Sequence, residues 1–312
     1  MISRALLSAM ILAVSGPSWA AGITGATTLR RPLSTRASAM AEAYSAVPGG
    51  LTSLGTNPAG LASTARPSLD TLFMSGVIDD TFGFIGWAQP MKKSAAAAGL
   101  SYYDAGKIDI RVSGGATETR TAARDFVGHL AWALSLPANA SAGATVKYYR
   151  FELAQEARAS GFAFDLGTQW KTPVKGLALG GAIQNLGPNV KFEQESDPLP
   201  LTWRTGLSWS WMSVPVQEDS AQTYLSGTRF VACADAIKMR GEAVLAALGA
   251  ELAMDFGPTT SIALRGGMRL NTNAGSMTLG LGLREGRYRL DYALGEKSSL
   301  GHVHHAGLGV RF

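Results

Sequence analysis

The stretch LTWRTGLSWSWM, residues 201–212, indicates the fold class on its own. Apolar residues occupy alternate positions, and small or charged residues stand between them. One face carries Leu201, Trp203, Leu207, Trp209 and Trp211, and the other carries Thr202, Arg204, Gly206, Ser208 and Ser210. A period of two predicts a β-strand. Three tryptophans opposite arginine, glycine and serine are typical of a strand that faces lipid on one side and a crowded polar interior on the other.

The same alternation recurs along the rest of the chain. We expect strands near residues 68–78, 82–91, 94–105, 123–136, 141–153, 160–171, 175–186, 200–211, 228–238, 243–256, 259–270, 275–284, 287–295 and 301–312. Many of these runs have about ten residues, the length that a tilted strand needs to cross a bilayer. The pattern predicts an all-β fold, a 14-stranded antiparallel transmembrane β-barrel over residues 67–312.

The connections between these strands suggest an orientation. Short turns are expected at the periplasmic end of such a barrel and longer loops at the extracellular end. The longer pieces 106–122, 154–159, 187–199 and 296–300 would then lie outside the cell. Residues 212–227 are an exception, because they are long and yet fall on the periplasmic side.

The polar face of the strands combines small residues with charges of both signs. A soluble β-sandwich would carry a surface rich in Lys and Glu there. The candidate lumen charges are Asp165, Arg204, Asp235, Glu251, Arg265, Arg269, Arg287, Arg289 and Asp291. We expect these arginines and carboxylates to pair inside the lumen, since ionisable groups at membrane depth are costly when left alone. An anion-selective arginine lining is the alternative.

The tryptophans of the opening stretch indicate membrane interfaces. Trp203 and Trp211 stand eight residues apart, which is about 27 Å of strand. Trp and Tyr form girdles at both edges of the apolar band of outer-membrane barrels. We therefore expect Trp203, Trp209 and Trp211 at the two interfaces, in contact with outer-membrane lipid.

Both ends of the chain resemble export signals. Residues 1–20, MISRALLSAMILAVSGPSWA, have the basic start, apolar run and small-residue end of a secretory signal peptide. The chain ends GLGVRF, with Leu308, Val310 and Phe312 on one strand face. A terminal aromatic residue in such a strand resembles the signal read by the bacterial outer-membrane insertion machinery. The predicted location is the bacterial cell outer membrane.

Composition narrows the function classes. The single cysteine, Cys233, excludes an intrachain disulfide, and the net charge of +5 includes no basic block, so nucleic acid is not an expected partner. The sequence has no phosphate loop, nucleophile elbow or zinc spacing. Alternation turns His302 and His304 of the HVHH cluster away from His305, so they do not converge on a metal. We expect no enzyme activity, no metal and no cofactor.

Residues 21–66 do not alternate and precede the first strand. They are apolar enough to be buried, with a short helical stretch near 37–46 followed by Gly and Pro turns. We interpret them as an N-terminal plug inside the lumen, here called the hatch segment. Its motif Asn57, Pro58, Ala59 and Gly60 is expected to set a turn that seats the segment, and a gating role is the alternative.

The sequence resembles a known family of barrels. GTNPAGLA (55–62) is similar to the Asn-Pro-Ala-Gly motif after the N-terminal segment of FadL-like barrels. The closer resemblance is to the PorV/PorQ branch, carried by FAFDLGTQW, by LALGGAIQNLGPNVKF followed by LPLTWRTGLSW, and by the C-terminal LGLGLREGRYRLDYAL and GHVHHAGLGVRF. AIQNLGP (182–188) is its most specific part. Residues 46–52, AVPGGLT, depart from it, since the family has an acidic pair there.

The resemblance implies a fourteen-stranded outer-membrane barrel with a hatch and leaves two functions open. One is a component or cargo carrier of type IX-like protein export, with secretion-system components or exported cargo as partners. Residues 212–227 offer such a partner a periplasmic surface. The alternative is a FadL-like passive channel for hydrophobic small molecules, with a path through the hatch and a lateral opening.

Overall fold

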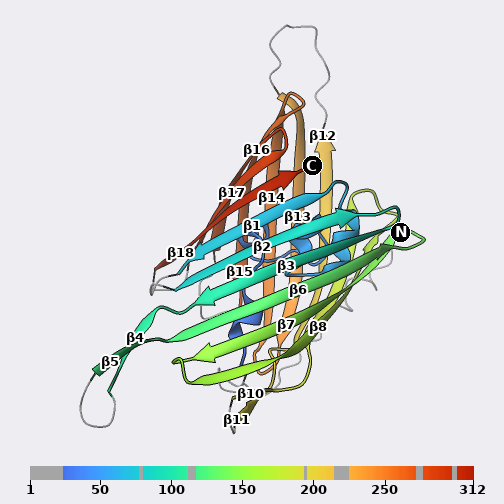
Figure 1. The fold of residues 1–312 in the computed structure, drawn as a ribbon. Helices are drawn as coiled ribbons and strands as arrows, with labels where there is room; N and C mark the ends of the chain where they lie inside the picture. Colours follow the sequence, from blue (N-terminus) through green and yellow to red (C-terminus); the bar gives the residue numbers. More distant parts are fainter. Residues whose placement is uncertain are drawn as a thin grey trace, which may run out of the picture.

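A closed antiparallel barrel of fourteen strands forms the body of the protein (Figure 1). The computed structural model describes residues 24–76, 80–111, 117–192, 195–213, 225–271, 277–296 and 301–312. The barrel strands are β1 (Ser68–Ser75), β2 (Thr81–Pro90), β3 (Ser94–Asp104), β6 (Ala123–Ser135), β7 (Ala140–Leu153), β8 (Ala157–Lys171), β9 (Leu177–Leu186), β12 (Thr202–Ser213), β13 (Leu225–Met239), β14 (Val244–Phe256), β15 (Thr260–Leu270), β16 (Met277–Glu285), β17 (Tyr288–Glu296) and β18 (His302–Arg311). The predicted fold class and all fourteen expected strands are confirmed, with ends that differ by a few residues.

The first and last strands close the barrel. β1 pairs with β18, with Ser68 opposite Arg311 and Phe73 opposite Ala306. Closure leaves no free strand edge, which is the condition for placing β-structure in hydrocarbon. It also puts the start of β1 and the end of β18 at the same end of the barrel.

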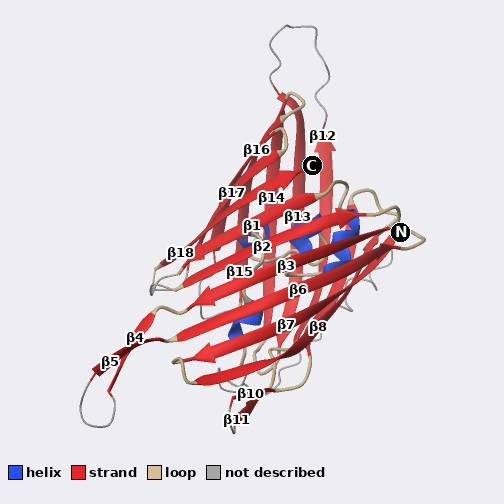
Figure 2. Cartoon of the chain, viewed as in Figure 1, coloured by secondary structure: helices blue, strands red, loops and turns tan. Residues whose placement is uncertain are grey.

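Two expected loops contain strands. β4 (Lys107–Arg111) pairs with β5 (Thr117–Thr121), and β10 (Val190–Phe192) pairs with β11 (Glu195–Asp197). Both ribbons lie at the end of the barrel opposite the C-terminus (Figure 2). We take that end as extracellular, because longer connections occur there in such barrels. Most of residues 212–227 and the whole of the predicted signal peptide, residues 1–20, lie outside the described residues.

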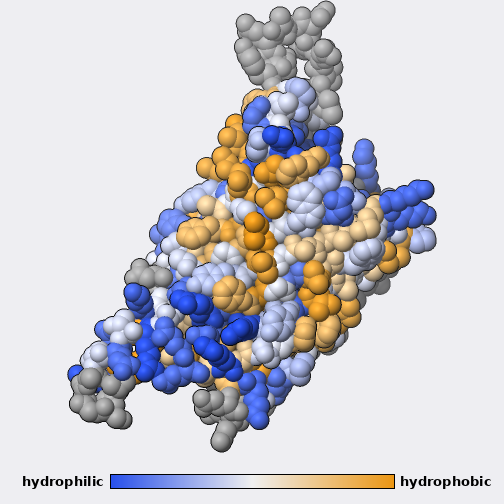
Figure 3. Space-filling view, in the orientation of Figure 1, coloured by the Kyte–Doolittle hydropathy of each residue, from blue (hydrophilic) through white to orange (hydrophobic). Residues whose placement is uncertain are grey.

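The outer surface of the barrel is apolar. Leu100, Leu130 and Leu279 are 63%, 65% and 59% exposed, and many other large apolar side chains share that face. Figure 3 shows apolar residues gathered over the near strands, with hydrophilic residues toward the β4–β5 end. No helix in the described ranges is long and apolar enough to cross a membrane. A closed barrel with this apolar outer surface is the architecture of the bacterial outer membrane.

The described part of the hatch segment, residues 24–66, lies inside the barrel. Its elements are η3 (Thr27–Arg30), α1 (Thr35–Ala39), η4 (Gly50–Ser53) and η5 (Pro58–Ser63), seen behind the near strands in Figure 2. Met40, Tyr44, Leu54 and Leu61 are fully buried. The main apolar cores of the described molecule therefore form between this segment and the inner wall.

The helix near residues 37–46 is shorter than predicted. α1 begins after Ser34, whose hydroxyl accepts a hydrogen bond from the Ala37 amide at 3.3 Å, and ends at Ala39. Ala41 and Glu42 then have φ angles of 53° and 60°. This left-handed pair cannot continue a right-handed helix, so the chain turns toward the barrel wall instead.

Candidate functional site: the lumen and its apolar wall

The Asn57 side chain fixes the turn that precedes η5. Its Nδ2 donates hydrogen bonds to the carbonyl oxygens of Ser45 at 2.7 Å and of Thr168 on β8 at 2.9 Å. Its Oδ1 accepts from the Ala59 amide at 3.0 Å, as a helix N-cap does. Pro58 occupies the first helical position, where its missing N–H costs nothing. Asn57 thus connects two parts of the hatch segment to the barrel.

Glycines of the wall make room for this turn. A Cβ at Gly167 of β8 would lie 2.0 Å from Oδ1 of Asn57, and a Cβ at Gly143 of β7 would lie 2.5 Å from the backbone of Pro58. Within the hatch segment, a Cβ at Gly60 would lie 2.5 Å from Cβ of Ser53. The predicted hatch motif is therefore seated against β7 and β8. A gating role of the motif stays a prediction.

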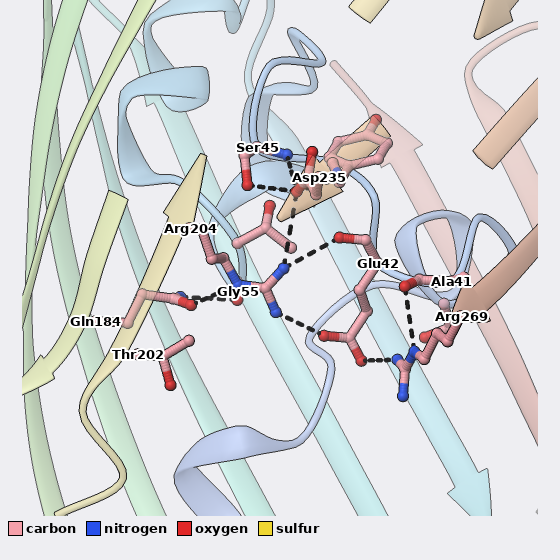
Figure 4. A network of polar contacts seen from close by, with 12 residues as sticks. Ala41, Glu42, Ser45, Gly55, Gln184, Thr202, Arg204, Asp235 and Arg269 are labelled. Atoms are coloured by element: carbon pink, nitrogen blue, oxygen red, sulfur yellow. Dashed lines mark hydrogen bonds and ion pairs between the residues drawn. The ribbon is translucent and has the colours of Figure 1, made fainter. Parts of the chain in front are cut away.

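Arg204 joins the barrel to the turn after α1 (Figure 4). Its Nη2 donates to Glu42 Oε2 at 3.0 Å, Nη1 to the Glu42 carbonyl at 3.1 Å, and Nε to Gln184 Oε1 at 2.8 Å. Arg269 donates to Glu42 Oε1 at 2.8 Å and to the Ala41 carbonyl at 3.2 Å. Burial alone would raise the pKa of Glu42, but the two guanidiniums hold that pKa below its ordinary value.

Asp235 holds the same turn from β13. Its Oδ2 accepts hydrogen bonds from the amides of Tyr44 at 3.1 Å and Ser45 at 3.0 Å and from the Ser45 hydroxyl (Figure 4). The left-handed residues Ala41 and Glu42 cost backbone free energy. The contacts of Asp235, Arg204 and Arg269 offset that cost.

A second chain of charges crosses the inner wall. Arg36 of α1 donates two hydrogen bonds to Glu251 of β14, at 2.7 and 2.6 Å. Arg265 of β15 donates to Glu251 at 2.6 Å and to Asp291 of β17 at 2.7 Å. Because Glu251 receives two guanidiniums, the ion pairs tie the hatch segment to three strands.

The chain of charges continues to β1. Arg289 donates to Asp291 at 2.7 Å and to Asp70 at 2.8 Å. The Arg289–Asp70 contact passes over β18 and the Arg265–Asp291 contact passes over β16. The residues of these two strands at the crossing points are Gly309 and Gly282. A Cβ at Gly282 would lie 2.7 Å from the Arg265 guanidinium, and one at Gly309 would lie 2.5 Å from Asp70. Glycine on alternate strands lets arginines and carboxylates meet across the strand between them.

Eight of the nine predicted lumen charges lie on the inner wall. They are Asp165, Arg204, Asp235, Glu251, Arg265, Arg269, Arg289 and Asp291, and each has an oppositely charged partner within 4.0 Å. This favours pairing over an anion-selective lining. Asp165, fully buried, lies 2.7 Å from Lys147.

The prediction for Arg287 is wrong. The residue is exposed in the turn between β16 and β17, and β17 starts only at Tyr288. Its guanidinium donates to the Tyr288 hydroxyl at 2.8 Å and stacks on that ring. Alternation places Arg287 in phase with Arg289, but Gly286, with φ 55°, ends the ladder before it.

Further lumen charges were missed, among them Asp70, Asp125, Lys147, Arg36 and Glu42. Lys147 alternates in phase with the inner face of β7, and Asp70 with that of β1, so the period could have revealed both. Arg36 and Glu42 lie in the hatch segment, where no period shows which way a side chain points.

The AIQNLGP stretch has a structural role at the end of β9. Asn185 adopts φ 60° where the β8–β9 register shifts. Its side chain accepts from Lys147 at 2.8 Å and donates to the Pro200 carbonyl at 3.1 Å, while its amide donates to Asp165 at 2.8 Å. These bonds give the buried Asp165–Lys147 pair further polar partners.

The wall formed by β1, β2, β3 and β6 has an apolar region on the inside. Leu33, Leu51, Leu54 and Leu61 of the hatch segment pack there against side chains that include Leu72, Met74, Phe82 and Phe84. Gly86 and Gly99 are cross-strand neighbours in this wall. A Cβ at Gly86 would lie 2.6 Å from the Phe84 ring, and one at Gly99 would lie 2.7 Å from it. The Phe84 ring thus lies over Gly86 and Gly99 on the lumen side of the wall.

A groove of about 460 Å³ lies on the membrane side of the same place. It is lined almost entirely by apolar residues, namely Leu69, Ile85, Gly86, Trp87, Ala98, Gly99, Leu100, Gly128, Leu130, Val146, Tyr148 and Phe162, with His129 as the exception. Gly86 and Gly99 border both the groove and the inner cluster. The wall between lumen and bilayer is therefore thin at this glycine pair.

The predicted interface residues lie on the outer face. Trp203, Trp209 and Trp211 are exposed near the two ends of β12. Leu308 and Phe312 are exposed and Val310 is half-buried; the Phe312 ring lies 5.2 Å from that of Trp87. The roles of these two sets in membrane anchoring and insertion stay predictions.

The fold and lumen define a class, a fourteen-stranded outer-membrane barrel with its N-terminal segment inside. No family model and no curated protein matches the sequence. The P. putida toluene transporter TodX has a similar structure, with TM-score 0.56 and 9% identity over 93% of this chain and 99% of that one. The Ralstonia pickettii toluene transporter TbuX gives 0.54 and 13% over 89% and 98%.

The CymD monoaromatic hydrocarbon channel is also similar, with TM-score 0.55 and 10% identity over 90% of this chain and 97% of that one. At such identities the likeness shows the fold alone. It agrees with the fourteen-stranded barrel that the sequence resemblance implies. The finer PorV/PorQ assignment stays a prediction.

Proposed function

We propose that the chain is an outer-membrane channel for small hydrophobic molecules. The observation that carries this proposal is the thin apolar wall at Gly86 and Gly99. An apolar cluster lines it on the lumen side and an apolar groove on the membrane side. A hydrophobic solute that passed here would go from lumen to bilayer without meeting water, which the hydrophobic effect favours.

The two sides of the lumen differ in polarity, and this difference suits the passage of a hydrophobic solute. Ion pairs on β12–β17 hold the hatch segment, while the side formed by β1–β6 contacts it mainly through leucine and phenylalanine. Two polar contacts, Arg31 with Asp80 and Thr28 with Asp125, also lie on that side. The polar side supplies anchorage and the apolar side supplies a path. The proposed solute is uncharged and small, since both the Phe84 ring and the paired backbone of β2 and β3 lie in its way.

The similar solved structures support the proposal. Two are described as toluene transporters and one as a monoaromatic hydrocarbon channel. The shared fold makes a channel for hydrophobic molecules a better supported reading than protein export, which was the first expectation from the sequence.

Toluene uptake tests the proposal. The chain would be expressed in a bacterium that lacks its own hydrophobic channels, and the initial rate of radiolabelled toluene uptake measured beside an empty-vector control. We expect a several-fold higher rate with the chain and an unchanged rate for a hydrophilic sugar of similar mass. Equal toluene rates with and without the chain would overturn the proposal.

A role in protein export is the second candidate. The support for it is the sequence resemblance to the PorV/PorQ branch, above all at AIQNLGP. Affinity purification from the native outer membrane after cross-linking distinguishes the two functions. Secretion components or exported cargo in the eluate would favour export, and a barrel recovered without them would count against it.

A further inference from the structure

The geometry points to a lipid-binding site on the outer face of the barrel. The groove beside Gly128 takes acyl chains of a phosphorylated glycolipid of the extracellular leaflet, and Arg150 binds its phosphate. This is the groove that also borders Gly86 and Gly99, but lipid binding there does not depend on the transport proposal.

Cross-strand register places the groove and the arginine in neighbouring rows of the outer face. One row is Leu100, Gly128, Tyr148 and Phe162, on β3, β6, β7 and β8, and the next row toward the extracellular end is Tyr102, Phe126, Arg150 and Ser160. Adjacent rows on one face are about 7 Å apart. The exposed Arg150 guanidinium is therefore within reach of the headgroup of a lipid whose chains lie in the groove.

The hollow itself comes from a missing side chain. Gly128 stands between Leu100 and Tyr148, which are 63% and 48% exposed, and Leu130 and Phe162 complete the walls. A Cβ at Gly128 would have only Leu100 and the Tyr148 carbonyl near it, both at 3.9 Å. The space is open to hydrocarbon and apolar on all these sides, so an acyl chain fits its chemistry.

Unlike the arginines near it, Arg150 has no carboxylate partner among the described residues. In the next row outward, Arg124 lies 3.4 Å from Asp104 and Arg158 lies 3.2 Å from Glu152. Among the described residues no carboxylate lies within 4.0 Å of Arg150. A guanidinium donates two parallel hydrogen bonds to a phosphate, so an unpaired one at the leaflet edge complements an anionic headgroup.

Figure 3 shows the same sequence of surfaces on the near face, where apolar residues give way to strongly hydrophilic residues toward the β4–β5 end. A lipid lying along the strands would place its chains over the first surface and its headgroup over the second. The apolar surface therefore complements the acyl chains of an anionic lipid, and the hydrophilic surface complements its headgroup.

Lipid A is the probe for the test. The folded barrel in a non-ionic detergent is titrated with lipid A and with lipid A stripped of both phosphates, and bound lipid is counted by native mass spectrometry. We expect lipid A to bind more tightly than the stripped form. Arg150→Ala should weaken lipid A binding about tenfold, the loss expected for one charge-assisted contact. Gly128→Leu, which fills the groove, should weaken binding of both lipids.

Arg66→Ala is the matched control. Arg66 is likewise exposed, but it lies just before β1, at the opposite end of the barrel, so its removal should leave lipid A binding unchanged. Heat-modifiable gel mobility confirms that each variant is folded. Equal binding of the two lipids, equal loss from Arg150→Ala and Arg66→Ala, or no effect of Gly128→Leu would each overturn the inference.

Discussion

At the scale of single residues, Glu251 is a buried charge that binds the hatch segment through Arg36. It accepts hydrogen bonds from both Arg36 and Arg265 in the buried lumen. Glu251→Leu leaves both guanidiniums without that carboxylate, so we expect a loss of about 3–5 kcal/mol in the free energy of unfolding. The free energy of unfolding is measured by denaturing the barrel, refolded in lipid vesicles, with guanidinium chloride.

Glu152→Gln is the control for this prediction. Its pair with Arg158 is open to solvent, with the Arg158 side chain 59% exposed. Such pairs contribute less than about 1 kcal/mol. Similar losses from the two substitutions would contradict the assigned role of the lumen network.

Glu42 gives a prediction on pH. Because Arg204 and Arg269 hold its folded pKa below the ordinary value of 4.5, its contribution to seating the hatch is present above the unfolded pKa. The contribution is lost as the pH falls through the lower folded pKa. We expect hydrogen exchange in residues 24–66 to be the same at pH 7 and pH 5 after correction for intrinsic rates. A rise between those two values would show that a different group controls the segment.

At the scale of elements, the strands β7 and β8 hold the hatch segment in position. Gly167→Leu would drive a side chain into Asn57 and Pro58, so we expect the segment to leave its seat. Cleavage by trypsin at Arg36, followed by mass spectrometry, reports this. Gly181→Leu is the control, since a Cβ at Gly181 has its nearest atoms at 3.8 and 3.9 Å. If both variants resist trypsin equally, the hatch segment is not held in place by contact with Gly167.

The strand faces make a second prediction at this scale. Leu281, near the middle of β16, is 55% exposed on the outer face, and Met277 is 56% exposed at the extracellular end of the same strand. Leu281→Arg should cost about 2–4 kcal/mol of unfolding free energy, and Met277→Arg about 0–1 kcal/mol. The depth dependence is measured by chemical denaturation in vesicles, and its absence would argue against a lipid-facing strand.

The positions of the strands, and the faces on which their side chains lie, could largely be predicted from the sequence. The period of two in residues 201–212 and its repeats locate the barrel strands, because each face of a membrane strand meets a different solvent. That period even assigns Asp165 and Arg265 to the lumen. It misplaces Arg287, because a tight turn ends the ladder without breaking the alternation.

The hatch segment shows where such reasoning stops. Its chain has no period, so the contacts of Arg36 and Glu42 depend on a path that only the folded barrel defines. The Asn57 motif could be recognised as a turn, but not the glycines of β7 and β8 that receive it. The Phe84 ring over Gly86 and Gly99 depends on the register of two strands, which alternation alone does not fix.

At the scale of the whole molecule, the barrel divides into an anchoring side and an apolar side. The ion pairs hold the hatch segment on the first, so it can stay in place while a solute passes on the second. In such an arrangement, transport does not require release of the whole segment. The rate then depends on how readily the Phe84 ring leaves the glycine pair.

The rate of radiolabelled toluene uptake by cells carrying Phe84→Ala, relative to wild type, tests the central claim most directly. Removal of the ring uncovers Gly86 and Gly99, so we predict a several-fold faster uptake. Phe151→Ala is the matched control, because Phe151 is an equally buried lumen phenylalanine in a different apolar cluster on β7; its uptake should equal wild type. Uptake that is unchanged in Phe84→Ala, or raised equally in both folded variants, would contradict passage through this wall.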